Sequence, residues 1–270
     1  MHAPFSSRSF VSVSLNQARE IKITTHRPSR PPIWVPVIVL ATLSWIVRAA
    51  DVDRSLQQEF WSSRSGWHLA DNTWVQFLYR YGTWPALIGA GSGLVVWLAS
   101  FFTFHLKPMR LFGGFLTLAM IFGPGLLING AFKEYYGRPR PKHVTEFGGS
   151  LPFRPLGEPT FDQRCKSFPS GHASMGFFWF APCIYFWQRH RRVALGFATL
   201  ALVHGGLMSL GRMAQGAHWL SDILWAAGIV YLSSWILHRG LVSIILKRPP
   251  IAERRGTFIE NQAPSLTNRT

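Results

Sequence analysis

The chain contains six apolar runs separated by polar segments. The runs cover residues 33–50, 84–104, 111–132, 170–187, 193–210 and 219–237, and each is 18 to 22 residues long. A helix needs about 20 residues to cross the hydrocarbon core of a bilayer. Helices of soluble proteins keep a polar face, which these runs lack, so a soluble protein with buried helices is a poor alternative. The pattern predicts an all-α membrane protein, a bundle of six transmembrane helices.

The polar segments divide the chain into a membrane domain and two tails. Residues 1–32 are rich in Ser, Arg and Pro, which predicts a disordered basic tail near anionic lipid headgroups. Residues 33–240 form the membrane domain, and residues 241–270 form a C-terminal tail whose role is not readable. Aromatic residues alternate with charges over residues 51–81, which favours a short amphipathic helix on the outer membrane surface.

The charge distribution predicts the orientation in the membrane. The chain carries a formal net charge of +16, which by itself could indicate a nucleic-acid partner. If the N-terminus is cytoplasmic, the inner segments hold 16 Lys and Arg against 3 acids, and the rest of the chain holds 12 against 9. This asymmetry follows the positive-inside rule. We therefore expect a bilayer rather than a nucleic acid as the partner, and no obligatory protein partner is evident.

Small and polar residues inside the runs predict local features of the bundle. Gly89, Gly91 and Gly93 favour close helix packing, and the sequence Gly123-Pro124-Gly125 predicts a kink.

One histidine and two cysteines of the membrane domain also need an interpretation. His204 lies at mid-depth, where an ionisable group is a candidate for function. The neighbouring glycines favour instead a neutral histidine that is hydrogen-bonded to another helix. Cys165 and Cys183 are the only cysteines, and because Cys183 lies within a run we expect no disulfide between them.

The stretch Phe168-Pro169-Ser170-Gly171-His172 precedes the fourth run. Ser170 and Gly171 would present backbone N–H groups at a helix start, where anions bind. His172 could then reach a bound anion. By itself the stretch is equally compatible with an ordinary helix cap.

Two more polar clusters flank apolar runs. Lys133 lies one helical turn after Asn129 and so on the same face, near the end of the third run, and Arg138 and Arg140 follow it.

The other cluster joins the fifth and sixth runs. It contains Arg212, His218 and Asp222, with Gly216 where the chain must turn. His218 and Asp222 are four residues apart and share a helix face, so the carboxylate can orient the imidazole.

The alternation of six helices brings all three clusters to the outer face. Lys133, Arg140 and Arg212 would repel one another around one pocket unless an anion lay between them, and a phosphate suits this role. Arginine binds phosphate oxygens in bidentate fashion and lysine acts as a point charge. These cations already supply the electrostatic stabilisation that a metal would give, so we expect no metal or other cofactor. Metal ligation by the two histidines and Asp222 is the rival interpretation.

The two histidines suit different roles. His218, oriented by Asp222, would keep a bare nitrogen and act as the nucleophile. His172 has no carboxylate partner in the sequence and could protonate the leaving oxygen.

These residues resemble the motifs of a known family, the type-2 phosphatidic acid phosphatases. Its first motif is similar to Lys133, six residues, then Arg140-Pro141, and its second to Pro169-Ser170-Gly171-His172. The third is similar to Arg212, five residues, His218, three residues, Asp222. The resemblance covers about residues 84–240, including the plan of six helices. It implies a phosphohistidine on His218, orientation by Asp222, general acid catalysis by His172, and phosphate binding by Lys133, Arg140, Arg212, Ser170 and Gly171.

Two positions need separate comment. Gly211 stands where the family usually has Ser, which puts one phosphate or supporting contact in doubt. Arg138 also lies in the first motif, but the spacing favours Arg140 as the phosphate ligand and leaves Arg138 for a second anionic group of the substrate.

The leading hypothesis is a lipid phosphatase of the bacterial inner membrane, with its active site facing the periplasm or exterior. The basic loop residues Lys142, Arg154, Arg164 and Lys166 favour a substrate with several anionic groups. A lipid A-type glycolipid or an isoprenoid diphosphate fits, and phosphatidic acid and phosphatidylglycerol phosphate stay open.

Three alternatives to hydrolysis remain. One is phosphate transfer to a second lipid, which can share the phosphohistidine. Another is a non-catalytic membrane protein that binds anionic lipids. The third is the vanadium haloperoxidases, whose anion pocket is similar, although six membrane helices argue against them.

The charge asymmetry makes a direct prediction about topology. Both termini should be cytoplasmic, and residues 134–169 should face outside. Cysteines placed at Thr145 and at His190 test this by thiol labelling from outside. Label at position 145 alone is expected, and label at position 190 alone would contradict it.

Overall fold

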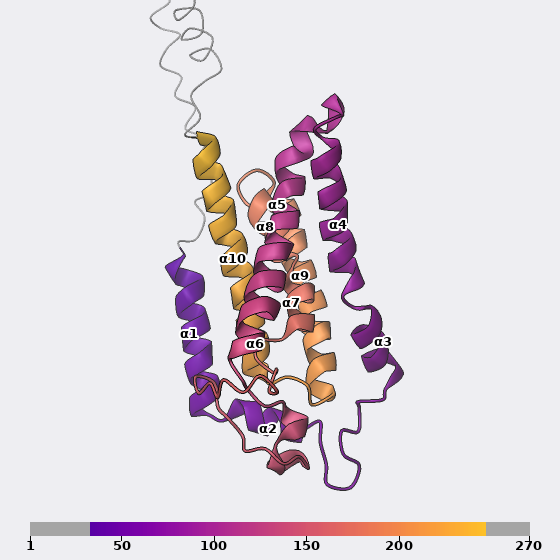
Figure 1. Cartoon of the computed structure of the whole chain (residues 1–270), viewed down its shortest axis with the longest axis vertical. Coiled ribbons are helices and arrows are strands. Elements are labelled where there is room, and N and C mark those ends of the chain that lie inside the picture. The colour runs from indigo at the N-terminus through magenta and orange to yellow at the C-terminus, as the bar shows by residue number, and fades with distance from the viewer. Residues whose placement is uncertain (1–32, 247–270) are drawn as a thin grey trace, which may run out of the picture.

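The computed structural model describes residues 33–246, and within this range every regular element is a helix (Figure 1). The longer helices are α1 (Trp34–Ala49), α2 (Val52–Gln58), α3 (Thr73–Tyr81), α4 (Trp84–Ala99), α5 (Arg110–Met120), η3 (Ile121–Phe132), α7 (Gly171–Phe177), α8 (Phe180–Phe186), α9 (Arg191–Ala214) and α10 (Leu220–Leu246). The shorter ones are η2 (Phe104–Met109), α6 (Lys133–Tyr135), η4 (Pro141–His143) and η5 (Thr145–Phe147). The predicted tail 1–32 and residues 247–270 lie outside the described residues.

Four helices in the described range are long and apolar enough to cross a membrane. They are Thr73–Ala99, Phe104–Tyr135, Arg191–Ala214 and Leu220–Leu241, and a fifth results if α1 and α2, which meet at 65°, count as one bent span. The helical membrane protein is therefore supported, whereas the sixth span stays a prediction. Helix α10 also continues to Leu246, beyond the expected domain end at residue 240.

The fourth apolar run does not form a continuous helix. It is divided into α7 and α8, with a turn at Phe178 and Trp179. Pro182 explains the position of the break, because a proline ring clashes with the carbonyl group four residues earlier, here that of Phe178. The Phe178 carbonyl instead accepts a hydrogen bond from the N–H of Ala181 at 2.9 Å.

The predicted kink at Pro124 takes the form of a π-helix. The whole segment η3 has this wider spacing, and the Asn129 amide donates to the Pro124 carbonyl at 2.7 Å. Asn129 also accepts a 3.5 Å hydrogen bond from Lys133, so the predicted shared face is confirmed.

The glycines of α4 behave in two ways. Gly93 meets Gly113 of α5 so closely that a Cβ on Gly113 would lie 2.6 Å from the Gly93 carbonyl oxygen. Gly89 likewise packs against Trp179, with only 3.2 Å for an added Cβ. The prediction of close packing is thus confirmed at these two positions. It is wrong at Gly91, which faces open space with no atom within 4 Å of an added Cβ.

The interpretation of His204 and of the cysteines is confirmed. The His204 ring accepts a hydrogen bond from the Trp179 indole at 2.9 Å, and its other nitrogen lies 2.8 Å from the Gly82 carbonyl oxygen. It therefore links α9 to the turn between α3 and α4. Cys165 and Cys183 are both buried and free.

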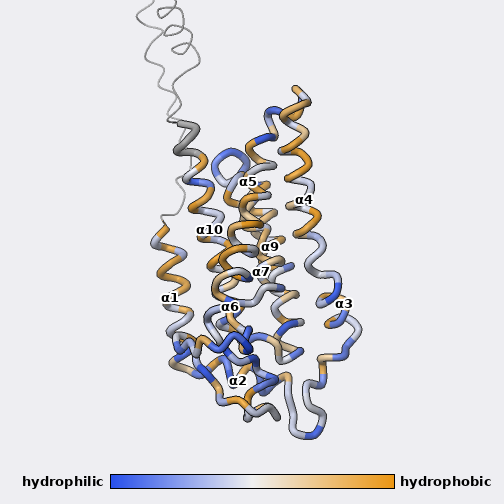
Figure 2. The backbone as a smooth tube through the Cα atoms, in the orientation of Figure 1, coloured by the Kyte–Doolittle hydropathy of each residue, from blue (hydrophilic) through white to orange (hydrophobic). Residues whose placement is uncertain are grey.

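Polar segments gather at one end of the bundle. Figure 1 shows α2, α6 and the loop between α6 and α7 together at the lower end, and Figure 2 shows that hydrophilic residues concentrate there. The segment 51–81 was expected to lie on the membrane surface as one amphipathic helix. Instead it contains two helices: α2 packs against the start of α10, and α3 packs against α9. This end contains all three polar clusters.

The contact between α4 and α5 predicts a difference between two glycine substitutions. Gly113→Ala should lower the free energy of unfolding by about 1–3 kcal/mol, because the added methyl would force the backbones apart. Gly91→Ala is the matched control and should be neutral or stabilising, since alanine favours helix and the position is open. Thermal unfolding in detergent measures both. Equal effects would contradict this account of the packing.

Candidate functional site

The three motifs meet at the polar end and are joined by backbone hydrogen bonds. The Lys142 N–H donates to the Gly216 carbonyl at 2.9 Å, which ties the first motif to the third. The Ser167 N–H donates to the Arg138 carbonyl at 3.0 Å, which ties the second to the first. Gly216 has a φ of +58°, so the predicted turn is confirmed.

His218 is buried between these motifs, with 1% of its surface exposed. Its Nδ1 lies 2.7 Å from the Ser167 carbonyl oxygen, which can only accept a hydrogen bond, so Nδ1 carries the proton. The Asp222 carboxylate lies 3.7 Å from the same nitrogen, which is too far for a hydrogen bond. Direct orientation of His218 by Asp222 therefore stays a prediction, because the two groups are close enough for an ion pair but the short hydrogen bond at Nδ1 goes to the Ser167 carbonyl. The carbonyl of Ser167 holds the ring, and Nε2 is left without a proton.

Asp222 acts on this arrangement through its neighbours. Its Oδ2 accepts hydrogen bonds from the Ser167 hydroxyl at 2.6 Å and from the Trp219 N–H at 2.9 Å. The second bond is a capping interaction, in which an acidic side chain in the first helical turn bonds the N–H just before the helix. Asp222 thus fixes both the start of α10 and the segment that contacts His218.

Arg138 contacts Asp222 and is completely buried. It donates to Asp222 at 2.6 Å, to Asp53 at 2.8 Å and to the Arg154 carbonyl at 3.0 Å. Burial lowers the pKa of Arg138, but the two carboxylates more than offset this and raise it above its ordinary value. The expectation that Arg138 binds a second anionic group of the substrate is wrong, because carboxylates of the protein occupy its guanidinium.

Helix α2 contributes two buried residues that sequence reasoning missed. Asp53 accepts hydrogen bonds from the Ser221 N–H at 2.9 Å and from the Ser221 hydroxyl at 2.5 Å. Gln57, one turn later, donates to the His218 carbonyl at 2.9 Å. Their spacing of four residues is the signal that they share a helix face, but nothing in the sequence indicates what that face contacts.

Lys133 and Gly171 bring the first and second motifs together. A Cβ on Gly171 would lie 3.2 Å from Nζ of Lys133 and 2.6 Å from Oδ1 of Asn129, so only glycine fits here. Ser170 is the N-cap of α7, and its hydroxyl accepts a hydrogen bond from the Ala173 N–H at 3.3 Å. Its own N–H donates to the Asp222 carbonyl at 3.2 Å. The Gly171 N–H therefore stays the better candidate for an anion at this helix start.

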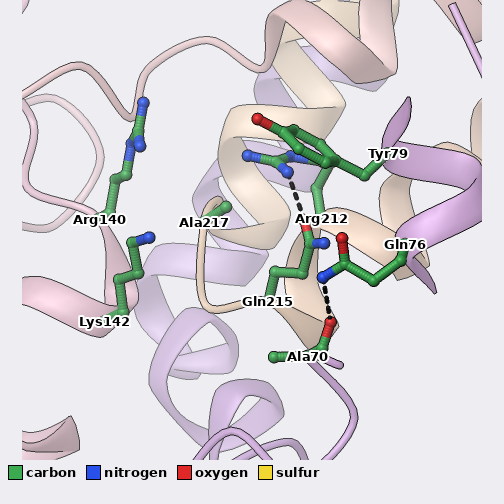
Figure 3. Close-up of a pocket in the computed structure, with 8 residues that line it drawn as sticks. All are labelled: Ala70, Gln76, Tyr79, Arg140, Lys142, Arg212, Gln215 and Ala217. Carbon is green, nitrogen blue, oxygen red and sulfur yellow. Dashed lines mark hydrogen bonds between the residues drawn. The ribbon is translucent and has the colours of Figure 1, made fainter. Parts of the chain in front are cut away.

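Arg140 and Arg212 line a pocket of about 260 Å³. Arg140 and Lys142 stand on one side of it, and Arg212 stands on the other beside Tyr79 and Gln215 (Figure 3). The Arg212 guanidinium donates to the Gln215 side chain, while its buried Nε has no partner among the described residues. Burial, followed by the charges of Arg140 and Arg212, lowers the pKa of Lys142. The pocket is thus rich in cations.

Tyr79 of α3 joins two predicted site residues. Its ring stacks on the His172 ring with centroids 5.1 Å apart and planes 23° apart. The Arg212 guanidinium carbon lies 4.7 Å from the centre of the same ring, within cation–π range. Sequence reasoning placed Tyr79 only within the segment 51–81 expected at the membrane surface, because aromatic side chains of either role look alike in sequence.

The other loop cations are mostly neutralised by nearby acids. Lys166 pairs with Glu134 at 2.5 Å, and Arg164 pairs with Asp162 at 2.9 Å. Neither residue lines the pocket of Arg140 and Arg212. Of the basic loop residues, only Lys142 does so.

Gly211 lies on the side of α9 that faces α3. A Cβ there would meet the Leu78 side chain at 3.8 Å, an ordinary contact, so a serine would fit.

Burial decides the protonation of His218. Burial lowers the pKa of His218 to about 4, although the nearby Asp222 carboxylate raises it. The ring is therefore neutral at pH 7. Within residues 33–246, no group of three or more His, Cys, Asp and Glu side chains is placed to hold a metal ion. Both Asp222 oxygens are already bonded to protein donors.

Comparison with known proteins gives one family and several relatives. The family model described as the PAP2 superfamily matches residues 112–244. A lipid A 4'-phosphatase of Francisella tularensis subsp. novicida is 38% identical over 126 residues, covering 46% of this chain and 55% of that protein.

Two other proteins of the same name, from Rhizobium leguminosarum and Rhizobium etli, are 34% and 33% identical. The matches cover 46% and 47% of this chain, and 51% and 47% of those proteins. The chain thus matches about half the length of its curated relatives. No solved structure matches it significantly.

The buried position of Arg138 predicts a large loss of stability when its charge is removed. Arg138→Met leaves two carboxylates buried without their cation, which typically costs about 3–5 kcal/mol. Arg164→Met is the matched control, because Arg164 is 90% exposed and its ion pair should contribute little. Thermal unfolding in detergent compares the two. Similar unfolding temperatures for both variants would show that the buried cluster contributes little to stability.

Proposed function

We propose that the chain is a member of the PAP2 superfamily, whose model matches residues 112–244, and that it hydrolyses a phosphomonoester of a lipid A-type glycolipid through a phosphohistidine. The observation that carries this proposal is the contrast between two sets of cations. Arg138 is neutralised by carboxylates. No acid pairs with Lys133, Arg140 or Arg212 among the ion pairs of residues 33–246. An uncompensated group of this kind favours a bound phosphate.

His218 is the proposed nucleophile. Its bare Nε2 attacks phosphorus and forms a P–N bond as the bond to the lipid oxygen breaks. The imidazole becomes positively charged in this step. The Ser167 carbonyl on Nδ1, together with the excess negative charge of Asp53 and Asp222 over Arg138, stabilises that charge.

The cations and the helix start of α7 hold the phosphate in the proposed mechanism. Lys133, Arg140 and Arg212 contact its oxygens, and the Gly171 N–H contributes a hydrogen bond, with Ser170 beside it. In this proposal the groups are fixed before the reaction and stabilise the five-coordinate phosphorus without rearranging.

His172 is the proposed general acid. It gives a proton to the leaving lipid oxygen, and it then takes a proton from the water that attacks the phosphohistidine. The second step breaks the P–N bond, releases phosphate and restores neutral His218. Tyr79 keeps the His172 ring in place by stacking.

The choice of substrate rests on the relatives. Three of them are named for the 4'-phosphate of lipid A, which favours a phosphorylated glycolipid over an isoprenoid diphosphate or phosphatidic acid. We place the protein in the bacterial inner membrane with this site facing the periplasm or exterior, from the charge asymmetry of the sequence. Transfer to a second lipid would use the same phosphohistidine, with a lipid hydroxyl in place of water.

The first test is phosphate release by the purified protein from phosphorylated lipids. His218→Ala should abolish release and also remove any acid-labile phosphoenzyme trapped by rapid quenching. A phosphoenzyme that survives His218→Ala would place the nucleophile elsewhere. Binding of the lipid without release by the wild type would select the non-catalytic alternative.

A second prediction separates His172 from His218. General acid catalysis typically contributes about 10²–10⁴-fold when the leaving group is poor, whereas an aryl phosphate leaves as a stable phenolate. His172→Ala should therefore lose more activity on the lipid than on an aryl phosphate, and His218→Ala should lose both alike. The measurement is residual activity on the two substrates.

If Tyr79 positions His172, loss of its ring should also lower activity on the lipid more than activity on an aryl phosphate. Tyr79→Leu removes the stacked ring and should lower lipid activity more than aryl phosphate activity, whereas Tyr79→Phe should keep both. Tyr81→Leu is the matched control, because Tyr81 lies on the same helix and contacts Phe77 instead. Equal losses on both substrates would assign His172 and Tyr79 to phosphate binding or to structure.

A further inference from the structure

A second cavity shares the lining residue Lys142 with the pocket of Arg140 and Arg212. It has a volume of about 360 Å³, and its lining includes Lys142, His143, Ser150, Asp162 and Arg164. Lys142 also lines the pocket of Arg140 and Arg212. Lys142 is therefore the residue that the linings of the two cavities share.

The wall of the second cavity is held in place by hydrogen bonds. The N–H groups of Ser150 and Leu151 both donate to the His143 carbonyl, at 3.0 and 2.9 Å. The Thr145 N–H donates to the Leu151 carbonyl at 2.9 Å. A Cβ on Gly149 would lie 2.1 Å from the carbonyl carbon of His143, so the chain there is in close contact. The backbone that lines the cavity, in the loop between α6 and α7, is thus held in one conformation.

The chemistry of this lining suits a sugar. His143 and Ser150 offer groups that donate or accept hydrogen bonds, and Asp162 and Arg164 form an ion pair at its edge. Such alternating donors and acceptors match hydroxyl groups. Leu151 and Cys165 add apolar surface to the lining.

Lys142 lines both cavities and can bind an anionic group of a ligand between them. Its N–H is fixed to the third motif, and none of the ion pairs among residues 33–246 includes its ammonium group. Arg140 and Arg212 are near enough to act on its charge. An ammonium group among other cations needs an anion beside it.

We propose that the two cavities form one substrate groove, in which the second cavity binds the sugar that carries the scissile phosphate. Lys142 contacts the phosphate side of that sugar at the junction. This inference rests on the proposed function and narrows it, because it makes the headgroup, and not only the phosphate, a determinant of specificity. Phosphatidic acid has no sugar to place in the second cavity.

The test fills the second cavity and leaves the phosphate pocket unchanged. Ser150→Trp should raise KM for a phosphorylated disaccharide lipid by at least about tenfold, the equivalent of one or two lost polar contacts. The same variant should keep the wild-type KM for phosphatidic acid and for an aryl phosphate. Ser63→Trp, an exposed loop position outside both cavities, is the matched control and should leave all three values unchanged.

A second variant guards against a folding defect in the first. His143→Ala enlarges the second cavity without blocking it and should raise KM for the disaccharide lipid several-fold, with kcat on phosphatidic acid retained. Equal changes on all substrates, or no change on any, would overturn the inference. That outcome is distinct from failure of the proposed function, in which the wild type would release no phosphate from any of the three substrates.

Discussion

The buried guanidinium of Arg138 is the contact on which the rest of the site depends. A charge removed from water is costly unless it is paired and fully hydrogen-bonded. Arg138 meets that condition by bonding Asp53 of α2 and Asp222 of α10, and it lies 5.4 Å from the centre of the Trp219 ring. The same two carboxylates bind the first N–H groups of α10. One ionic cluster thus fixes α2, the first motif and the helix start after His218.

This cluster also explains how His218 is held in its buried position. Asp222 positions the Ser167 hydroxyl, and the Ser167 carbonyl holds Nδ1 of the imidazole. The compensated charges lie behind the histidine. The uncompensated cations Arg140 and Arg212 line a pocket together with Ala217, the neighbour of His218 in the sequence, and this pocket is where the proposed phosphate binds. The paired set of charges thus stabilises the structure, and the unpaired set is the one that we propose binds the substrate.

The sequence predicted the helical class, because hydropathy is read from residues that are neighbours in the chain. It also predicted the site motifs, because the residues of each motif are close together in the sequence. It also predicted that His218 and Asp222 would be near neighbours. It could not predict that Asp53 and Gln57 support the site, since these contacts join residues more than 160 positions apart. Tyr79 was missed because an aromatic residue that contacts the site looks the same in sequence as one at the membrane surface. The divided fourth run was expected to be one helix, although Pro182 contained the physical signal for the break.

The most direct test of the account is the tautomer of His218. The protein labelled with ¹⁵N-histidine can be studied by NMR at pH 7, with the His218 signals assigned by comparison with His218→Gln. The account predicts a neutral ring with the proton on Nδ1, as the Ser167 carbonyl requires, and a bare Nε2. A proton on Nε2, or on both nitrogens, would contradict the proposed role of His218 as the nucleophile.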